Sequence, residues 1–477
     1  MERKPPERLL CSRAMPEALV AAPSSPVEAL LAEWGRSPGD PRLAVDPGDE
    51  MLAFLRDLHG GDAEQALCEY YRSGASIAAV LLEVLRWRFG DPRRVGSLLD
   101  FASGYGRVTR FLLDEVAADA VTASDVLPEA IAFQRRVLGV RAAPSSARVE
   151  ELELPGGFDA ILVTSLFTHL PEARFAPWLA ALLGRLGAGG VLAFSTHELA
   201  LLPPEQRPAS GCCFQPHSEI AELATDDYGS TWVDEAFVRS ALAATGLRVA
   251  ARRFERVLCN YQDLWVVVLD PAEGFSGLAL VGEPEVVVEE CAVDARRLDL
   301  VGWAHARRGA VSAVEALVDG ISLGVAPVAT YRGDVAAARG ESAGRSGWTI
   351  SAALPAGASP VGSVLLLRAV DGEGRRRAIW AGRLVGAALQ TRALQLREVR
   401  ADLHRLRGDL VEREARAAEQ IAALRHRVAD VEAELAVSRH ETNESRAEIS
   451  RMRASRFWKL RDAWFACKRA LRLTDET

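Results

Sequence analysis

The first half of the chain alternates between short apolar runs typical of buried strands and longer segments with helical spacing. Helical spacing covers 49–59, 63–71 and 75–89, and an apolar run over 95–101 follows directly. Later strand-like runs lie at 120–125, 158–163, 191–195, 247–259 and 263–269. Because short apolar runs alternate with helical segments, the pattern predicts a parallel sheet with helices on its faces, completed by a late antiparallel pair of strands.

After residue 271 the pattern changes to short strand-like runs with no helical segments between them. These runs lie at 286–288, 298–303, 313–318, 347–353, 364–369 and 378–384. Turn-forming residues separate them at 319–320, 357–360 and 371–374. Short strands at regular spacing predict a small β-sandwich of about 100 residues.

The C-terminal part of the chain has a heptad pattern followed by a basic, aromatic tail. One apolar row recurs every seven residues, at Leu396, Leu403, Leu410, Ala417, Leu424 and Val431. The second row is Val399 and Leu406, then Ile421, Val428 and Leu435. The heptads predict a coiled coil and therefore a homo-oligomer, a dimer or trimer. The tail predicts a basic amphipathic helix that lies on an anionic membrane surface or binds a protein partner.

These patterns divide the 477 residues into consecutive parts. We expect a flexible N-terminal arm at 1–48, an α/β domain at 49–272, a β-sandwich at 283–387, a coiled coil at 392–454 and an amphipathic tail at 455–477.

Composition and charge exclude several classes of function. The net charge of -8 argues against a general nucleic-acid binder, which would carry a basic face. There is neither an apolar run long enough to span a membrane nor an N-terminal secretory signal, so a cytoplasmic protein is expected. The seven cysteines are scattered, without the spacing of metal ligands, so reduced thiols and no metal site are predicted.

The most specific motif is Asp-Phe-Ala-Ser-Gly-Tyr-Gly-Arg at 100–107. Gly104 and Gly106 lack a Cβ atom and therefore let the backbone approach a ligand closely. Asp125 ends the next apolar run, nineteen residues after Gly106, where nucleotide-binding units place the carboxylate that binds ribose hydroxyls. A dinucleotide fingerprint would have a third glycine at Thr109. The spacing therefore indicates an adenosine-type cofactor other than a dinucleotide.

An acidic residue followed by small residues and Gly-x-Gly resembles motif I of the class I S-adenosylmethionine-dependent methyltransferases. Segments at 158–171, 183–195 and 261–268 resemble the later strands and turns of that family, in the family's order. The resemblance covers roughly 50–272 and implies a Rossmann-like, seven-stranded doubly wound sheet with S-adenosyl-L-methionine as cofactor. It departs from the family at Ala102, where glycine is common. The implied cofactor contacts come from Asp100, Ala102, Ser103, Gly104, Gly106 and Asp125.

Four further residues are candidates because of their places near the same edge of the sheet. Ser165 follows the fourth strand of the resemblance and is expected to contact cofactor or acceptor. His169 and His197 are candidate general bases for an acceptor hydroxyl. For each histidine the alternative is a ring satisfied by local backbone. Tyr71 is expected in a lid over the cofactor, with ordinary helix packing as the alternative. The loop at 200–230 is expected to set acceptor specificity.

Two hypotheses of function follow. The first is a methyltransferase that acts on an oxygen of a glycan or small-molecule acceptor, since the β-module, coiled coil and tail resemble parts of bacterial surface-polysaccharide biosynthesis proteins. The second is a non-catalytic scaffold, with a degenerate methyltransferase domain, that organises a membrane-proximal glycan assembly. In both, the coiled coil joins copies of the chain, and the tail contacts the inner face of the cytoplasmic membrane or a glycosyltransferase.

Overall fold

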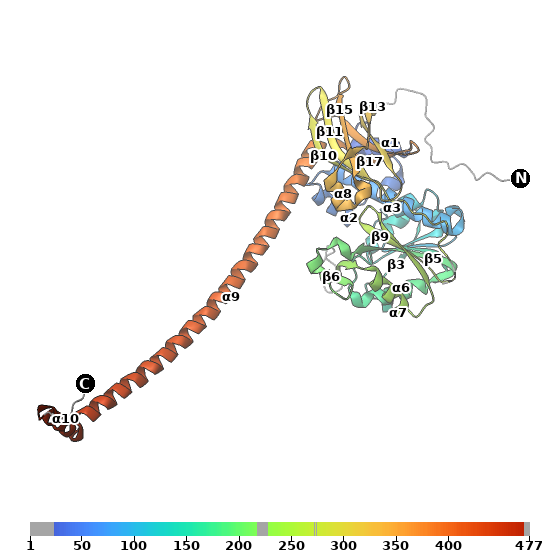
Figure 1. Ribbon diagram of the computed structural model, residues 1–477. Helices are drawn as coiled ribbons and strands as arrows, with labels where there is room; N and C mark the ends of the chain where they lie inside the picture. Colours follow the sequence, from blue (N-terminus) through green and yellow to red (C-terminus); the bar gives the residue numbers. More distant parts are fainter. Residues whose placement is uncertain (1–22, 217–227, 271, 273, 472–477) are drawn as a thin grey trace. The chain divides into compact units, whose positions relative to one another are not determined.

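The computed structural model describes residues 23–216, 228–270, 272 and 274–471, shown in Figure 1. It divides into two compact units, residues 1–392 and 393–477. Within the described residues, none of the helices combines the length and apolar character needed to cross a bilayer.

The first unit contains a large mixed sheet whose central strands are parallel. From edge to edge its strands are β3 (Arg141–Pro144), β2 (Val121–Asp125), β1 (Leu98–Phe101), β4 (Phe158–Val163), β5 (Leu186–Glu198), β9 (Gln262–Val268) and β8 (Ala250–Leu258). The first five are parallel, while β9 runs antiparallel to β5 and to β8. A hairpin of β6 (Cys212–Pro216) and β7 (Gly229–Val233) pairs with the end of β5. The predicted parallel sheet with a late antiparallel pair is confirmed.

Helices cover both faces of this sheet. They are α2 (Glu50–Leu58), α3 (Ala63–Phe89), α4 (Thr109–Leu112), α5 (Pro128–Val137), α6 (Glu172–Leu183) and α7 (Glu235–Ala244). Successive side chains of a strand point to opposite faces. Leu98 accordingly packs in one core with Leu81 of α3, and Leu99 packs in the other with Leu179 of α6. The carboxyl ends of β1, β2, β4 and β5 therefore meet at one edge, where the candidate site lies.

The sequence predicted separate helices at 63–71 and 75–89, whereas the structure has one continuous helix, α3. The polar interruption at Arg72 is explained by distant partners, because its guanidinium pairs with Glu69 and with the buried Glu283. A Cβ atom at Gly74 would overlap the carbonyl oxygen of Arg107. Both residues thus serve packing against other segments and do not end the helix.

The expected flexible arm at 1–48, in which the sequence already shows one short helical pattern at 27–34, is corrected in part. Residues 1–22 lie outside the described residues, but residues 26–33 form α1 (Pro26–Glu33). Leu30 and Leu31 of α1 are buried in the core that also contains Leu81 of α3. The Glu33 carboxylate accepts two hydrogen bonds from Arg368, at 2.5 and 2.7 Å. This segment is therefore fixed by a buried apolar face and an ion pair.

A β-module, residues 285–383, completes the first unit. One sheet contains β10 (Glu285–Val293), β11 (Arg297–His305), β15 (Arg345–Ala353) and β14 (Thr330–Tyr331), and the other contains β13 (Ile321–Pro327), β12 (Val311–Val318), β16 (Val364–Asp371) and β17 (Arg376–Arg383). A core with the buried Trp348 and Leu367 joins the sheets. All six predicted runs form strands, and β13, β14 and α8 (Gly333–Arg339) were missed.

The β-module shares a core with the α/β part. Leu317 and Leu366 of the β-module are buried in the same cluster as Leu31 of α1 and Leu81 of α3. Figure 1 shows α1 and α3 next to the β-module strands. The two parts predicted as separate domains therefore form one compact unit.

The second unit contains all of α10 (Arg456–Ala470) and the part of α9 (Leu384–Ala454) that follows residue 392. The helices separate at Ser455, which caps α10 by accepting a hydrogen bond from the backbone N–H of Trp458 at 3.4 Å. Five heptad residues of α9 are exposed: Ile421, Leu424, Val428, Val431 and Leu435. The continuous helix is observed, and the coiled coil stays a prediction. Residues 472–477 of the predicted tail lie outside the described residues.

Candidate cofactor and acceptor site

The loop after β1 begins with a buried carboxyl group. Asp100 is 1% exposed, and its Oδ2 accepts a hydrogen bond from the Thr109 hydroxyl at 2.7 Å. Burial, together with the negative charge of Asp125, raises the pKa of Asp100 to about 6 despite this bond. Thr109 stands where a dinucleotide site would have its third glycine. Here its side chain orients Asp100, a role that the spacing alone did not reveal.

The backbone of this loop is left-handed at three of the predicted cofactor residues. Ala102, Gly104 and Gly106 have φ of 56°, 52° and 77°. A left-handed conformation costs a residue with a Cβ atom about 1–2 kcal/mol, which gives a physical reason for glycine at the position of Ala102. A Cβ atom at Gly106 would lie 2.7 Å from Leu138 Cδ1, whereas one at Gly104 would meet no atom within 4 Å. Gly106 serves helix packing, and Gly104 borders open space.

Gln134 of α5 holds the loop from the other side. Its Nε2 donates to Ser103 Oγ at 2.8 Å and to the carbonyl oxygen of Gly104 at 2.7 Å. The backbone N–H of Ser103 also donates to the carbonyl oxygen of Ser124 at 3.2 Å. Sequence reasoning missed Gln134, because a single polar residue in an amphipathic helix gives no signal of its distant partners.

Asp125 connects the ends of β1 and β2. Its Oδ2 accepts from the N–H of Gly104 at 2.8 Å, and its Oδ1 accepts from the N–H of Leu127 at 3.0 Å. Burial raises the pKa of Asp125, against the effect of these backbone donors. The carboxylate lies beside the open space at Gly104, as a ribose-binding residue should. The loop and Asp125 therefore fit an adenosine-type cofactor.

The ends of β4, β5 and β9 bring a second group of polar side chains together. Ser165 has φ of 71°, and its N–H donates to Ser195 Oγ at 2.8 Å. Gln262 Nε2 lies 3.3 Å from Ser165 Oγ and 3.4 Å from His197 Nε2. Sequence reasoning missed Gln262. Its signal was the antiparallel pairing of β9, which returns the first residue of that strand to the carboxyl edge of β5.

His197 is buried and neutral at pH 7. It is 7% exposed, and burial with the nearby His169 lowers the pKa of His197 to about 4. Its ring centroid lies 4.7 Å from that of Tyr261. With Gln262 donating, the lone pair of the neutral imidazole is at Nε2, on the side of Ser165 and Gln262. The position of His197 is compatible with a general base, and its role as a base stays a prediction.

His169 is held by the β6–β7 hairpin. Its Nδ1 donates to the carbonyl oxygen of Gly229 at 2.7 Å, and its ring stacks on Tyr228 with centroids 4.6 Å apart. The backbone partner is 60 residues away in the chain, whereas the alternative interpretation expected a local one, and the bond fixes the tautomer with the lone pair at Nε2. Part of the loop expected to set acceptor specificity, residues 217–227, lies outside the described residues.

Tyr71 lies in the middle of α3 and is 5% exposed. Its hydroxyl donates to the carbonyl oxygen of Leu43, and its ring packs edge-on against Tyr70. These contacts correspond to ordinary helix packing, the alternative to the expected lid. Two other residues of this segment contact the glycine loop: Ser73, whose Oγ accepts from Arg107 at 2.8 Å, and Gly74, which packs against the Arg107 carbonyl.

Residues 98–190 match the family model of a methyltransferase domain. The match begins at β1, includes Asp100 with the loop that follows it and Asp125 at the end of β2, and ends within β5. The prediction of a methyltransferase domain from motif I is confirmed over these residues. No curated protein matches the chain.

Several solved structures are similar to this part of the chain. DhpI in complex with SAH is 17% identical, with a TM-score of 0.31 over 48% of this chain and 100% of that chain. DesVI of Streptomyces venezuelae is 16% identical, with a TM-score of 0.33 over 48% and 100%. CalS10 with bound SAM, an amino pentose methyltransferase of Micromonospora echinaspora, is 18% identical, with a TM-score of 0.31 over 41% and 92%.

Proposed function

We propose that this protein transfers a methyl group from S-adenosyl-L-methionine to an oxygen of a glycan or small-molecule acceptor. The observation that carries the proposal is the meeting of two groups at one edge of the sheet. The glycine loop and Asp125 lie at the ends of β1 and β2, and Ser165, His197 and Gln262 lie at the ends of β4, β5 and β9.

The residues divide the work between holding the cofactor and preparing the acceptor. The cofactor, when bound, supplies a methyl group on a positively charged sulfur. Asp125 would bind the ribose hydroxyls, while Asp100 and Thr109 keep the loop in shape. His197 and His169 are the two candidates for accepting the acceptor's hydroxyl proton, and at His197 the acceptor would take the place of the Gln262 amide at Nε2. Until the acceptor binds, Gln262 would position His197. Alignment of acceptor and methyl group is the main contribution expected of such a site.

The scaffold alternative is distinguished from the enzyme by measuring cofactor binding and methyl transfer separately. Isothermal titration should show binding of both S-adenosylmethionine and S-adenosylhomocysteine by the folded protein. Isotope-labelled methyl groups should then appear on hydroxyls of a cell-envelope glycan fraction. Absence of heat from both cofactors would refute the proposal, and binding without transfer to any acceptor fraction would favour the scaffold. The left-handed backbone at Ala102 supports the enzyme, since the loop keeps this conformation without glycine.

We also propose that α10 lies on an anionic membrane surface. Phe457, Leu460 and Trp464 are 72%, 72% and 61% exposed on one side of the helix, and Arg461 and Lys468 flank them. A helix with an exposed apolar face and basic borders binds the headgroup region of anionic bilayers. The full chain should co-sediment with vesicles containing phosphatidylglycerol and far less with phosphatidylcholine vesicles.

Variants on two sides of α10 test this proposal. Leu460→Asp with Trp464→Asp should abolish vesicle binding, whereas Ala466→Asp, away from the apolar face, should retain most of it. Equal binding by both variants, or equal binding to both lipids, would contradict the proposal and leave a protein partner for α10.

A further inference from the structure

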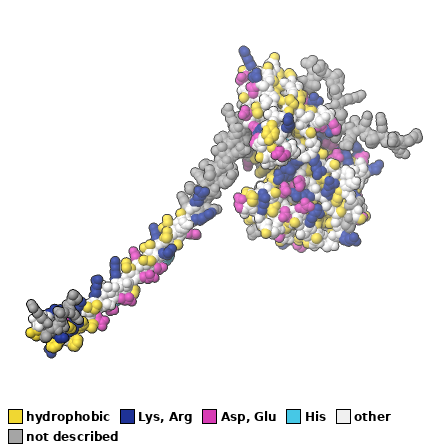
Figure 2. Space-filling view, in the orientation of Figure 1, with side chains coloured by type: hydrophobic (Ala, Val, Ile, Leu, Met, Phe, Trp, Pro, Cys, Tyr) yellow, Lys and Arg dark blue, Asp and Glu magenta, His cyan; other side chains and the backbone are white. Residues whose placement is uncertain are grey.

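A cleft lies where the β8–β9 hairpin meets the β-module. Its cavity volume is about 20 Å³, and it is lined on one side by Phe254, Glu255, Arg256 and Asn260 and on the other by Glu283, Arg307 and Arg308. Arg307 and Arg308 belong to the loop between β11 and β12. Figure 2 shows arginine side chains on this face of the first unit, with acidic side chains among them.

The arginines of the cleft carry more positive charge than the nearby acids compensate. Burial, with the like charges of Arg256 and Arg339, lowers the pKa of Arg307, although Glu255 and Glu285 act in the opposite direction. Glu285 itself accepts hydrogen bonds from Arg339 at 2.8 and 3.0 Å. A guanidinium under these conditions is stabilised by an added anion.

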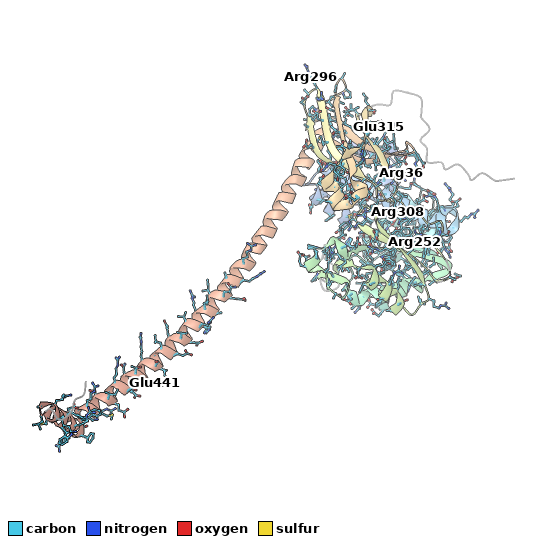
Figure 3. All side chains as sticks on the ribbon, in the orientation of Figure 1. Arg36, Arg252, Arg296, Arg308, Glu315 and Glu441 are labelled. Carbon is cyan, nitrogen blue, oxygen red and sulfur yellow. The ribbon has the colours of Figure 1, made fainter. Side chains whose placement is uncertain are left out.

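The remaining charged groups of the cleft lead to the same conclusion. Glu283 pairs with Arg72, and Arg256 donates to Glu198 at 3.1 Å. The guanidinium of Arg308 lies 5.6 Å from the centre of the Phe254 ring, and that of Arg252 lies 4.7 Å from it. Figure 3 shows Arg308 and Arg252 close to each other at this junction. Of the lining charges that remain, Arg307 and Arg308 face one carboxylate, that of Glu255, so the local excess is one positive charge.

The cleft is adjacent to the acceptor end of the candidate site. Asn260 precedes Tyr261, whose ring contacts that of His197. Arg256 pairs with Glu198, the residue after His197 on β5. The hairpin therefore has the candidate base next to one end and the arginines at the other.

We propose that this cleft binds an oxyanion of the acceptor, a phosphate or a carboxylate, while the hydroxyl to be methylated lies near His197 and Gln262. Guanidinium groups suit both anions, because their planar N–H donors match pairs of oxygen atoms. The acceptor class is accordingly an anionic sugar derivative. This inference rests on the proposed function for the role of the bound molecule, and anion binding itself can be measured without methyl transfer.

The test is titration of the full chain, saturated with S-adenosylhomocysteine, with glucose 1-phosphate, glucuronate and glucose. The first or second sugar should bind and glucose should not, and the preference identifies phosphate or carboxylate as the anion. Arg307→Gln with Arg308→Gln should weaken binding by about tenfold or more, because charge-assisted hydrogen bonds are lost. Arg296→Gln is the control for the single variants Arg307→Gln and Arg308→Gln, because Arg296 is likewise exposed but lies at the far end of the β-module (Figure 3).

The outcomes distinguish this inference from the proposed function. Binding of S-adenosylhomocysteine without binding of either anionic sugar would overturn the cleft proposal alone. Equal weakening by Arg296→Gln would overturn it too, since the effect would then reflect net charge only. If the chain binds an anionic sugar but does not bind S-adenosylhomocysteine, the result would support the cleft proposal and contradict the proposed methyltransferase function. Thermal unfolding identifies misfolded variants, and the single variants Arg307→Gln and Arg308→Gln then replace the double one.

Discussion

Asp100 and His197 are buried titratable residues whose pKa values shift in opposite directions. Burial raises the pKa of Asp100 to about 6 and lowers the pKa of His197 to about 4. Between these values, folding favours the protonated Asp100 and the neutral His197. As the pH falls from 6 to 4, Asp100 therefore adds stability while His197 removes it. The two contributions largely cancel in the wild-type protein.

Single substitutions should reveal each contribution. Relative to wild type, Asp100→Asn should lose stability as the pH falls from 6 to 4, since only the His197 effect remains. His197→Gln should gain stability over the same range. Each shift of about two pKa units corresponds to roughly 3 kcal/mol at most. Chemical denaturation at several pH values measures the differences, and parallel curves for all three proteins would contradict the assignment.

Asp125 should contribute to cofactor affinity. Asp125→Ala removes the carboxylate beside Gly104, so binding of S-adenosylmethionine should weaken by roughly 1.5–3 kcal/mol, the range for charge-assisted hydrogen bonds. Asp159→Ala is a matched control, since Asp159 also accepts from two backbone N–H groups, those of Gly96 and Ser97, but at the other edge of the sheet. Titration calorimetry should show a loss for the first variant only.

At the scale of elements, the contact between α3 and the glycine loop is the feature that the site depends on. Gly74 brings the helix against the carbonyl group of Arg107, and Ser73 accepts a hydrogen bond from the Arg107 side chain. Helix α3 thereby holds the glycine loop in place through Arg107. A change in the helix should therefore reach the cofactor.

Gly74→Ala tests this contact. Alanine favours helix by about 1 kcal/mol, but the overlap with Arg107 costs more, so a net loss of about 1–2 kcal/mol is expected. Cofactor affinity should fall with it. Gly39→Ala is the control, because its Cβ atom would meet only Ser37 Oγ at 3.8 Å. Denaturation and cofactor titration measure both effects, and a stabilised Gly74→Ala with normal affinity would contradict this role.

At the scale of the whole molecule, the heptad residues of α9 are the candidate surface for self-association. Ile421, Leu424, Val428, Val431 and Leu435 are between 48% and 61% exposed. A row of this kind is stable in water when another helix covers it. We therefore propose that two or three copies of the chain associate through α9.

Sedimentation of the full chain tests the association. The wild-type protein should sediment as a dimer or trimer at micromolar concentration. Leu424→Glu with Val431→Glu should shift it to monomer, while Ala422→Glu with Ala429→Glu, off the apolar row, should not. A monomeric wild-type protein would refute the proposal.

Much of the fold followed from local sequence patterns. The strands at 98–101 and 364–371 were predicted at 95–101 and 364–369, because each pattern records which face of its own segment is buried. The loop of motif I needs small residues at fixed places, so the sequence by itself also predicted the class of cofactor.

Tertiary structure alone decided which distant residues meet. The sequence pattern ends a helix just before Arg72, whereas in the structure the helix continues and Arg72 pairs with the distant Glu283. The apolar face of α1 is buried because other elements cover it. Gln134 and Gln262 reach the site from α5 and β9, and Arg307 and Arg308 reach the cleft from the β-module. Local periodicity contains no record of such partners, because these contacts depend on how the elements pack together.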